Sequence, residues 1–209
     1  MSEPVRAASV AERVARAWDR FWFAPTGPLV PALMRIGVGV WAVVVLSSYT
    51  ADFSRWFDPR DGMLPVETVR WIAVELDRTA RFSYLDYLAD PTSLSLVHFA
   101  GMIVAALTAI GWKSRATSAL AGVVLLSYYH RSAATAEAVL PLIGCCALYL
   151  SLGPCGRVLS LDARLARRAA TGGLPRTATA DSRSTVSVRL IQLHAVLFLM
   201  QWPAAMFAR

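Results

Sequence analysis

The segment from residue 116 to 152 constrains the fold most, because two apolar runs flank the short polar turn Tyr129-His130-Arg131-Ser132. A helix needs about 20 residues to cross the hydrocarbon core of a bilayer, which is about 30 Å thick. Each run approaches that length, and a soluble protein would have to bury both. The pattern therefore predicts a transmembrane helical hairpin, with His130, Arg131 and Glu137 gathered at one membrane face.

The composition indicates the same class of protein. The 209 residues are 56% hydrophobic and 17% charged, whereas a typical soluble domain is about 45–50% apolar and about 25% charged. The net charge of +7 is carried almost wholly by arginine, and basic residues gather at the cytoplasmic ends of membrane helices. We therefore attribute the basic balance to membrane topology and expect no nucleic-acid partner.

The N-terminal segment, residues 1–28, is predicted to be an amphipathic helix lying in the membrane interface. Val10, Val14, Trp18 and Phe21 recur at helical spacing, and arginines occupy other positions of the helical wheel. Prolines and a glycine then end the pattern before the first apolar span.

Residues 29–209 are predicted to form one membrane domain. The expected fold is all-α, a multi-pass membrane helix bundle of about five transmembrane helices. The predicted spans are residues 29–49, 92–111, 116–129, 133–152 and 187–207. Two further short helices are expected in the polar loops, over residues 66–76 and 159–170.

Arginine and lysine bias predicts the orientation of this bundle. With five spans, the N-terminus and the loops 112–115 and 153–186 fall on one side, which carries most of the basic residues. The other side holds the acid-balanced segment 51–90. We therefore expect a protein of the cytoplasmic membrane, with its N-terminus in the cytoplasm and its C-terminus outside.

Seven short stretches, taken in order, resemble the HTTM (horizontally transferred transmembrane) domain, which is shared by many bacterial proteins and by vitamin K-dependent gamma-carboxylase. They are residues 21–25, 32–39, 61–65, 111–115, 128–131, 159–165 and 188–192. The resemblance implies a bundle of membrane helices entered from the cytoplasmic side. For the carboxylase it also implies that vitamin K hydroquinone and oxygen generate a base, which deprotonates a glutamate before carbon dioxide adds.

That chemistry depends, in the carboxylase, on a lysine near the end of the last span, where burial would lower the pKa of the amine. The corresponding stretch here, residues 201–207, contains no lysine. We therefore expect no carboxylase activity, and we predict no cofactor.

Polar residues expected on the outer side of the membrane nominate a candidate site. His98, His130 and Glu137 are the candidate catalytic groups, and Gln201 and Asp61 are the candidate substrate-binding groups. A buried carboxylate could hold a proton at neutral pH, whereas an exposed acid at a helix N-terminus would be structural. For each histidine on an apolar span, hydrogen-bonded packing is the alternative.

A second polar layer is expected nearer the cytoplasmic face and is interpreted as structural. We predict that Arg35 joins Gln192 or His194 there, since lipid offers these groups no partners. Asp162 is expected to cap or tie the cytoplasmic helix to the bundle. No metal site is predicted, because the three cysteines form no spaced pair.

These observations leave three classes of function open. The first is a non-catalytic accessory membrane protein that helps a secreted peptide or another membrane protein. The second is a membrane enzyme that modifies a peptide or lipid through the outer polar residues. The third is a small transporter or channel, which would need a polar stripe through the full membrane depth.

Overall fold

A computed structural model describes residues 10–25, 27–58, 62–63, 65–75, 81–132, 139–169 and 182–207 of the chain, with backbone only for 182 and 201–207. Within these ranges the protein is all-helical, with nine α-helices, one 3-10 helix and no strand. The prediction of an all-α fold is therefore confirmed.

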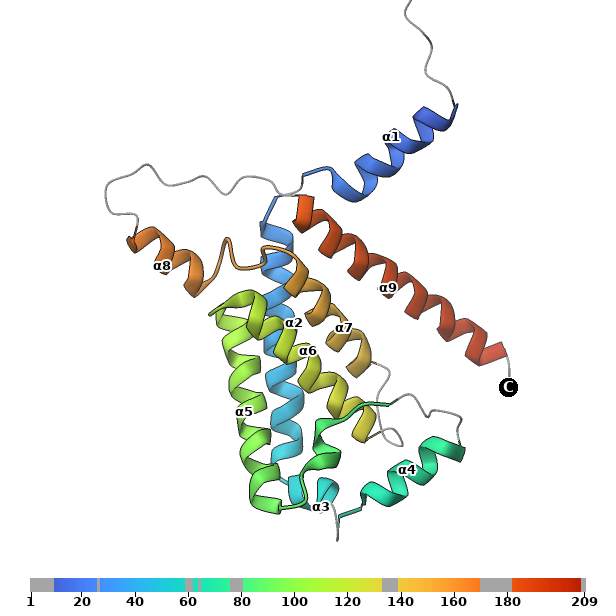
Figure 1. Ribbon diagram of the computed structural model, residues 1–209, viewed down its shortest axis with the longest axis vertical. Coiled ribbons are helices and arrows are strands. Elements are labelled where there is room, and N and C mark those ends of the chain that lie inside the picture. The colour runs from blue at the N-terminus through green and yellow to red at the C-terminus, as the bar shows by residue number, and fades with distance from the viewer. Residues whose placement is uncertain are drawn as a thin grey trace, which may run out of the picture.

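Five helices form the body of the molecule: α2 (Leu29–Thr50), α5 (Pro91–Ile110), α6 (Ser114–Arg131), α7 (Val139–Leu152) and α9 (Ser182–Phe207). Helices α2, α5, α6 and α7 run side by side, and α9 packs obliquely along α7 (Figure 1). Each corresponds to one predicted span. The largest differences are at α9, which begins five residues earlier, and at α7, whose predicted first residues lie outside the described ranges.

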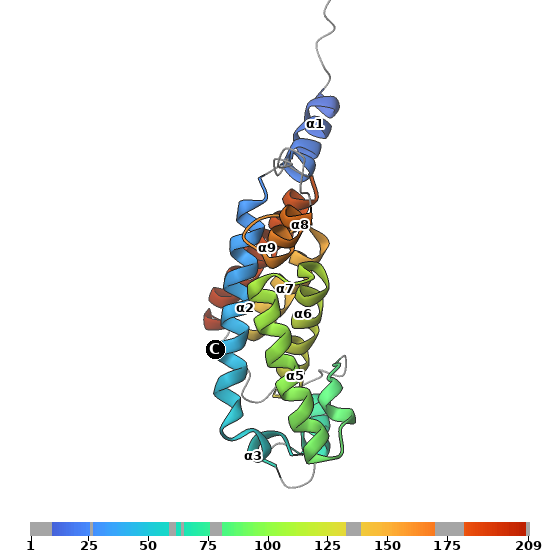
Figure 2. The ribbon, with the colours of Figure 1, turned by 90° about the vertical axis from the view of Figure 1, so that its left-hand side faces the viewer.

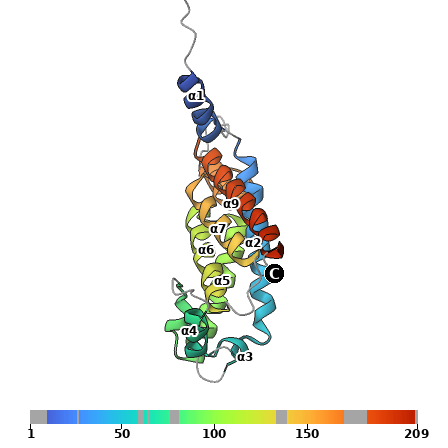
Figure 3. The same cartoon turned by 90° about the vertical axis from the view of Figure 1, so that its right-hand side faces the viewer.

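Shorter helices occupy the two ends of this elongated body (Figures 2 and 3). They are α1 (Val10–Phe23) and α8 (Leu161–Ala169) at one end, and α3 (Phe53–Phe57), α4 (Val66–Glu75) and the 3-10 helix η1 (Tyr84–Tyr87) at the other. Among the described residues, the two helices α2 and α5 are long and apolar enough to cross a bilayer, and α7 is a shorter apolar helix.

Local sequence explains where α5 begins and ends. The Asp90 carboxylate accepts a hydrogen bond from the Ser93 amide at 2.9 Å, and Pro91 occupies the first turn, so the N-terminus is capped. Gly111 ends the helix with φ 80°, in the left-handed region that glycine adopts without strain. A Cβ at Gly111 would lie 2.7 Å from Nη1 of Arg35, so this position requires glycine for space as well.

The distribution of side chains is unusual for a helical bundle. The interior contains the fully buried arginines Arg35 and Arg131, together with His98, which is 1% exposed. The outer faces instead present large apolar side chains. They include Leu33, Val40 and Val44 on α2, Leu96, Phe99 and Ile103 on α5, and Leu193, Val196 and Leu197 on α9.

Helix α1 extends beyond the bundle, and none of its residues is buried. Its contact with the bundle is through Arg189 of α9, whose Nε donates to the Phe21 carbonyl at 3.2 Å and whose guanidinium lies 4.3 Å from the Phe21 ring centre. The other apolar residues of its predicted face, Val10, Val14 and Trp18, are exposed. The predicted interfacial role of this segment stays a prediction.

Candidate functional site

The first polar cluster surrounds Arg35, near the end of the bundle that carries α8. Its guanidinium donates to four backbone carbonyls and meets no carboxylate. The acceptors are Cys155 at 3.2 Å, Thr108 at 2.5 Å, Ala109 at 2.7 Å and Leu159 at 2.7 Å. Thr108 and Ala109 belong to the last turn of α5, where the helix dipole favours a cation. Every nitrogen of this buried cation therefore has a partner, and we call this set the Arg35 cluster.

Asp162 joins this cluster by capping α6. Its carboxylate accepts hydrogen bonds from the Lys113 amide, the Ser114 amide and the Ser114 hydroxyl, each at 2.8 Å. Partial burial alone would raise the pKa of the Asp162 carboxyl. The hydrogen bonds from Ser114 and Lys113, with the positive charge of Arg35, outweigh that effect and hold the pKa below its usual value. Asp162 thus ties α8 to the start of α6.

The predicted pairing of Arg35 with Gln192 or His194 was wrong. The Gln192 side chain accepts from Arg189 at 2.8 Å, and Nδ1 of His194 lies 3.3 Å from the Tyr149 hydroxyl. Depth along the membrane normal does not reveal which face of a helix a residue occupies. The unpaired carbonyls at the end of α5 supply better partners for a guanidinium than a single amide or imidazole does.

His98 lies inside the opposite half of the bundle, and both of its ring nitrogens have hydrogen-bond partners. Its Nδ1 is 2.7 Å from the Tyr128 hydroxyl and its Nε2 is 3.0 Å from the Thr50 hydroxyl. The Phe53 ring stacks on it, with 4.2 Å between ring centres. A histidine with both nitrogens occupied and 1% exposure has no free atom for a substrate. This geometry is that of a packing histidine.

The second polar cluster lies at the end of the bundle covered by α3, α4 and η1. Its centre is the Asp86 carboxylate, which accepts a hydrogen bond from Arg81 and lies 3.6 Å from Nε of Arg131. The loop that carries Arg81 and Asp86 is held on α6 by Ser83, whose hydroxyl donates to the Ser127 carbonyl at 2.9 Å. We define the Arg131 cluster as Arg70, Arg81, Asp86 and Arg131.

Unlike the Arg35 cluster, this cluster contains buried polar atoms that lack hydrogen bonds to any described residue. They are Nε and Nη1 of Arg131, Nη1 of Arg81 and Oδ1 of Asp86. Nη2 of Arg131 donates to the Phe57 carbonyl at a long 3.4 Å. Such groups are rare in folded proteins because each normally finds a partner.

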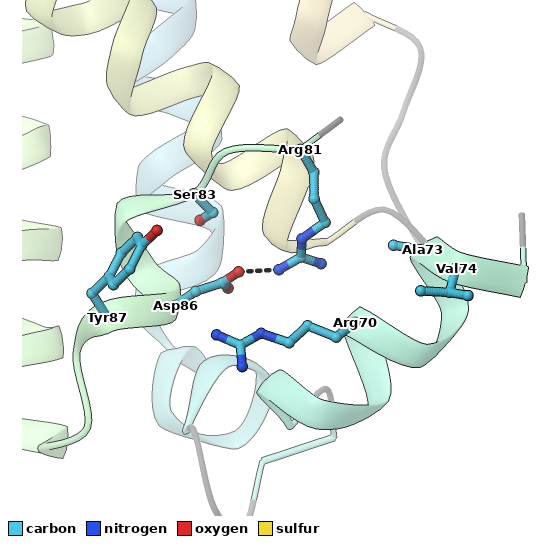
Figure 4. A pocket seen from close by; sticks show the side chains of 7 residues that line it. All are labelled: Arg70, Ala73, Val74, Arg81, Ser83, Asp86 and Tyr87. Carbon is cyan, nitrogen blue, oxygen red and sulfur yellow. Dashed lines mark hydrogen bonds and ion pairs between the residues drawn. The ribbon is translucent and has the colours of Figure 1, made fainter. Parts of the chain in front are cut away.

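A pocket of about 350 Å³ opens beside this cluster. Figure 4 shows Arg70 of α4 extending toward Asp86, with Arg81 on the other side of the carboxylate. Ser83, Val74 and Tyr87 complete its walls. A second pocket of about 390 Å³ adjoins it, shares Arg70 and Asp86, and adds Glu67. The site is a basic recess with an acidic floor, suited to binding an anion.

Among the predicted site residues that the structure describes, His130 lies close to this recess. It is half-buried, next to Arg131 on α6, and close enough to Arg81 and Asp86 to experience their charges. Glu137 and Asp61 lie outside the described residues, and for Gln201 only the backbone is described. The structure therefore leaves the predicted grouping of His98, His130, Glu137 and Gln201 untested as a whole.

Sequence reasoning missed Arg70, Arg81 and Asp86, because balanced charges in residues 51–90 were interpreted as a solvated surface. One signal was available. Arg81 and Asp86 are interleaved with Phe82, Tyr84 and Tyr87, and charged residues among aromatics are more typical of a built site than of a flexible loop.

No family model, curated protein or solved structure matches this chain. The resemblance to the HTTM domain therefore rests on the residues themselves.

Proposed function

We propose that this chain is a multi-pass integral membrane protein of the HTTM type, residing in the cytoplasmic membrane. The observation that carries the proposal is the inverted distribution of polarity, with Arg35, Arg131 and His98 inside and large apolar residues outside. In water such a surface would aggregate, whereas in lipid it is the expected one. The most apolar windows of α2 and α5 are only 39% and 28% buried, which favours membrane spans over the mostly buried core helices of a soluble protein.

Helix α6 fits the same arrangement. Helix α6 has 18 residues, which at about 1.5 Å each gives about 27 Å, nearly the depth of a bilayer core. Its polar residues Ser114, Thr117, Ser118 and Ser127 are buried against neighbouring helices. Small hydroxylated residues are common where membrane helices pack closely. The lower hydropathy of α6 therefore reflects its central position and is compatible with a membrane span.

The way in which the motif stretches meet supports the HTTM assignment. Arg35, Gly111 and Asp162 come from three different stretches, and all three belong to the Arg35 cluster. Arg131 comes from a fourth stretch and is central to the second cluster. Residues that are distant in sequence and converge on two buried arginines are what a shared membrane scaffold would require.

Within this class we propose an accessory role, for a secreted peptide or another membrane protein, in place of catalysis. The stretch 201–207 has no lysine, and both nitrogens of His98 are engaged. Asp86 is held between Arg81 and Arg131, which leaves it poorly placed to act as a base. The recess is therefore better suited to recognition than to proton transfer.

The second candidate is a membrane enzyme that modifies a peptide or lipid through the same recess. Its support is the position of His130, a potential general acid or base, within the electrostatic reach of Arg81 and Asp86. If this candidate is right, a His130→Gln variant should lose function while retaining its stability and its partner. An accessory protein should tolerate that change.

The membrane proposal is tested by location and topology. We expect the chain to remain in the membrane pellet after alkaline carbonate washing. In a background lacking Cys145, Cys146 and Cys155, cysteines at Ser2 and Ser182 should resist an impermeant thiol reagent added to intact cells. A cysteine at Glu67, exposed on α4, should react and serves as the matched control. Release by carbonate, or labelling of Ser2 and Ser182 in intact cells, would contradict the proposal.

A further inference from the structure

We propose that α8 and the turn between α5 and α6 form a surface that binds the head groups of anionic phospholipids. We define this α8 surface as five exposed cations, Lys113, Arg115, Arg164, Arg167 and Arg168. The inference rests on the proposed membrane location, because it names the lipids that this end of the bundle would meet.

The two ends of the bundle differ in charge. Residues 111–115 and 153–169, which form the α5–α6 turn, α8 and the loop before it, contain six basic residues and one acidic residue. At the opposite end, the described residues of the range 51–90 contain three basic and six acidic residues. A cluster of cations beside membrane spans attracts anionic head groups. Only the α8 end has the charge for such a partner.

The single acidic residue of α8 does not neutralise this surface. The carboxylate of Asp162 is directed at the start of α6, where it accepts hydrogen bonds from two backbone amides of the α5–α6 turn. Since a helix turns about 100° per residue, Arg164, Arg167 and Arg168 lie about 120–160° around α8 from Asp162. They are therefore on the side of α8 that faces away from α6, where the helix carries no carboxylate.

The surface is held in a fixed position by buried hydrogen bonds. The Arg35 guanidinium binds the carbonyls of Cys155 and Leu159, in the loop that leads into α8. The Asp162 amide donates to the Gly111 carbonyl at 3.1 Å, which joins the first turn of α8 to the end of α5. These bonds keep the cations of α8 beside those of the α5–α6 turn. A preorganised surface loses less conformational entropy on binding than a flexible basic segment does.

Apolar side chains next to these cations favour a lipid over a soluble partner. Leu165 of α8 is 48% exposed, Leu159 in the preceding loop is 52% exposed, and Trp112 in the α5–α6 turn is 38% exposed. Arg168 and Arg164 lie about 60° and 100° around the helix from Leu165. Leucine flanked by arginine is typical of a helix that lies in the membrane interface. Tryptophan is enriched at the same depth.

The direction of α8 fits this interpretation. The helix projects sideways from the end of the bundle where α2 begins and α5 ends (Figure 1). Because the long helices run along the body, a bilayer around them would place α8 along its surface. No residue of α8 is buried by the rest of the described chain, so its arginines are accessible to head groups.

The test measures which lipids gather around α8 in the full chain, reconstituted into phosphatidylcholine nanodiscs. In the background without the three native cysteines, Ala166→Cys places a donor fluorophore on the exposed part of α8. Energy transfer to a trace of phosphatidylglycerol with an acceptor on its acyl chain should exceed transfer to phosphatidylcholine labelled in the same way. The excess should fall as the salt concentration rises. A donor introduced by Glu67→Cys, on α4 at the opposite end, should show no such preference.

Two variants locate the effect on the α8 surface. Arg164→Gln and Arg168→Gln should each lower the preference for phosphatidylglycerol about fivefold, the expected contribution of one cation near an anionic surface. Arg55→Gln is the matched control, because Arg55 is exposed on α3 at the opposite end and its loss changes the net charge equally. An equal loss of preference in Arg55→Gln would reveal a general effect of net charge and would overturn the assignment.

Equal transfer to both lipids from the donor at position 166 would also overturn the proposal, and the arginines would then serve only to orient the chain in the membrane. The same result, together with binding of a polyglutamate peptide that changes the fluorescence of this donor, would reassign the surface to an acidic protein partner.

The membrane proposal and this one fail separately. A chain that carbonate releases from membranes, but that sediments with phosphatidylglycerol vesicles and not with phosphatidylcholine vesicles, would contradict only the proposed spans. A carbonate-resistant chain without a lipid preference at position 166 would contradict only the α8 surface.

Discussion

Two arginines of this protein share full burial but differ in their surroundings. Arg35 and Arg131 are each 0% exposed; Arg35 lies against the last turn of α5, and Arg131 is the last residue of α6. Arg35 donates to four backbone carbonyls. Arg131 makes one long hydrogen bond and a distant ion pair, and two of its nitrogens donate to no described residue. Every nitrogen of Arg35 has a hydrogen-bond partner, so we call its cluster saturated. Arg131 has nitrogens without such partners, so we call its cluster incomplete.

The difference teaches that burial of a charge does not by itself reveal its role. At Arg35 the chain has supplied all the partners, from the end of α5 and from the loop before α8, so the arginine joins these elements. At Arg131 the protein maintains a desolvated cation beside a pocket without completing its coordination. A cluster whose donors all have partners is suited to holding a fold together, whereas one with unpaired buried donors contributes less to stability.

The largest expected effect concerns the saturated cluster. Replacing Arg35 by methionine, which is similar in length but apolar, would leave four carbonyls without their donor inside the bundle. A buried acceptor left without its donor costs about 1–3 kcal/mol, and Arg35 serves four of them. We expect Arg35→Met to lower the thermal unfolding midpoint in detergent strongly and to reduce the amount of protein recovered from membranes.

The matched control is Arg115→Met. Arg115 is exposed at the same end of the bundle, where its Nε donates to the Ser151 carbonyl at 3.0 Å. The substitution therefore removes the same charge but only one surface hydrogen bond. An Arg35→Met protein as stable as Arg115→Met would show that the carbonyl cluster contributes little to the fold.

The helices were largely predictable from the sequence, since each depends on the local pattern of apolar residues. The apolar runs identify the long helices to within a few residues at most ends, and Asp90-Pro91 and Gly111 mark the limits of α5. Their function as membrane spans is a further step and stays a prediction, because only α2 and α5 meet the length and hydropathy of a span within the described residues.

The partners of the polar residues were not predictable in the same way. Arg35 was expected to meet a side chain on the last span, but its partners are carbonyl oxygens, which every residue carries and no sequence pattern marks. One of them, on Leu159, belongs to a residue with φ 51°, a backbone conformation that composition does not reveal. The meeting of Arg81, Asp86 and Arg131 depends on how a loop folds back on α6.

A moderate effect is expected at Asp162, which extends the saturated cluster to α8. Asp162→Asn should destabilise by about 1–2 kcal/mol at pH 7, because an uncharged cap holds the start of α6 less strongly. The folded state lowers the pKa of Asp162, so its contribution is complete above the unfolded pKa and is lost as pH falls through the folded pKa.

The measurement is thermal unfolding of both proteins from pH 7 to pH 3. The two curves should converge below about pH 4, the range in which an unperturbed aspartate becomes protonated. Asp52→Asn is the control, because Asp52 is exposed and its side chain caps no helix. A constant difference between wild type and Asp162→Asn at every pH would show that the effect is steric and not a consequence of charge.

The smallest effect on stability is expected at Arg131, and it tests the comparison most directly. Arg131→Met removes a desolvated cation that has few partners, and Asp86 keeps its hydrogen bond to Arg81. The variant removes the desolvation cost of this cation, and Asp86 is not left without a counter-charge because Arg81 remains. We therefore expect an unfolding free energy within about 1 kcal/mol of wild type, or higher.

Because Arg35→Met and Arg131→Met are the same substitution in two helices, differences in helix propensity largely cancel. Their unfolding midpoints, measured in one detergent, isolate the effect of the surroundings. A loss at Arg131 as large as that at Arg35 would mean that Arg131 also holds the fold together, and the distinction between a saturated and an incomplete cluster would then fail. A small loss would show that this arginine contributes little to the stability of the fold despite its full burial.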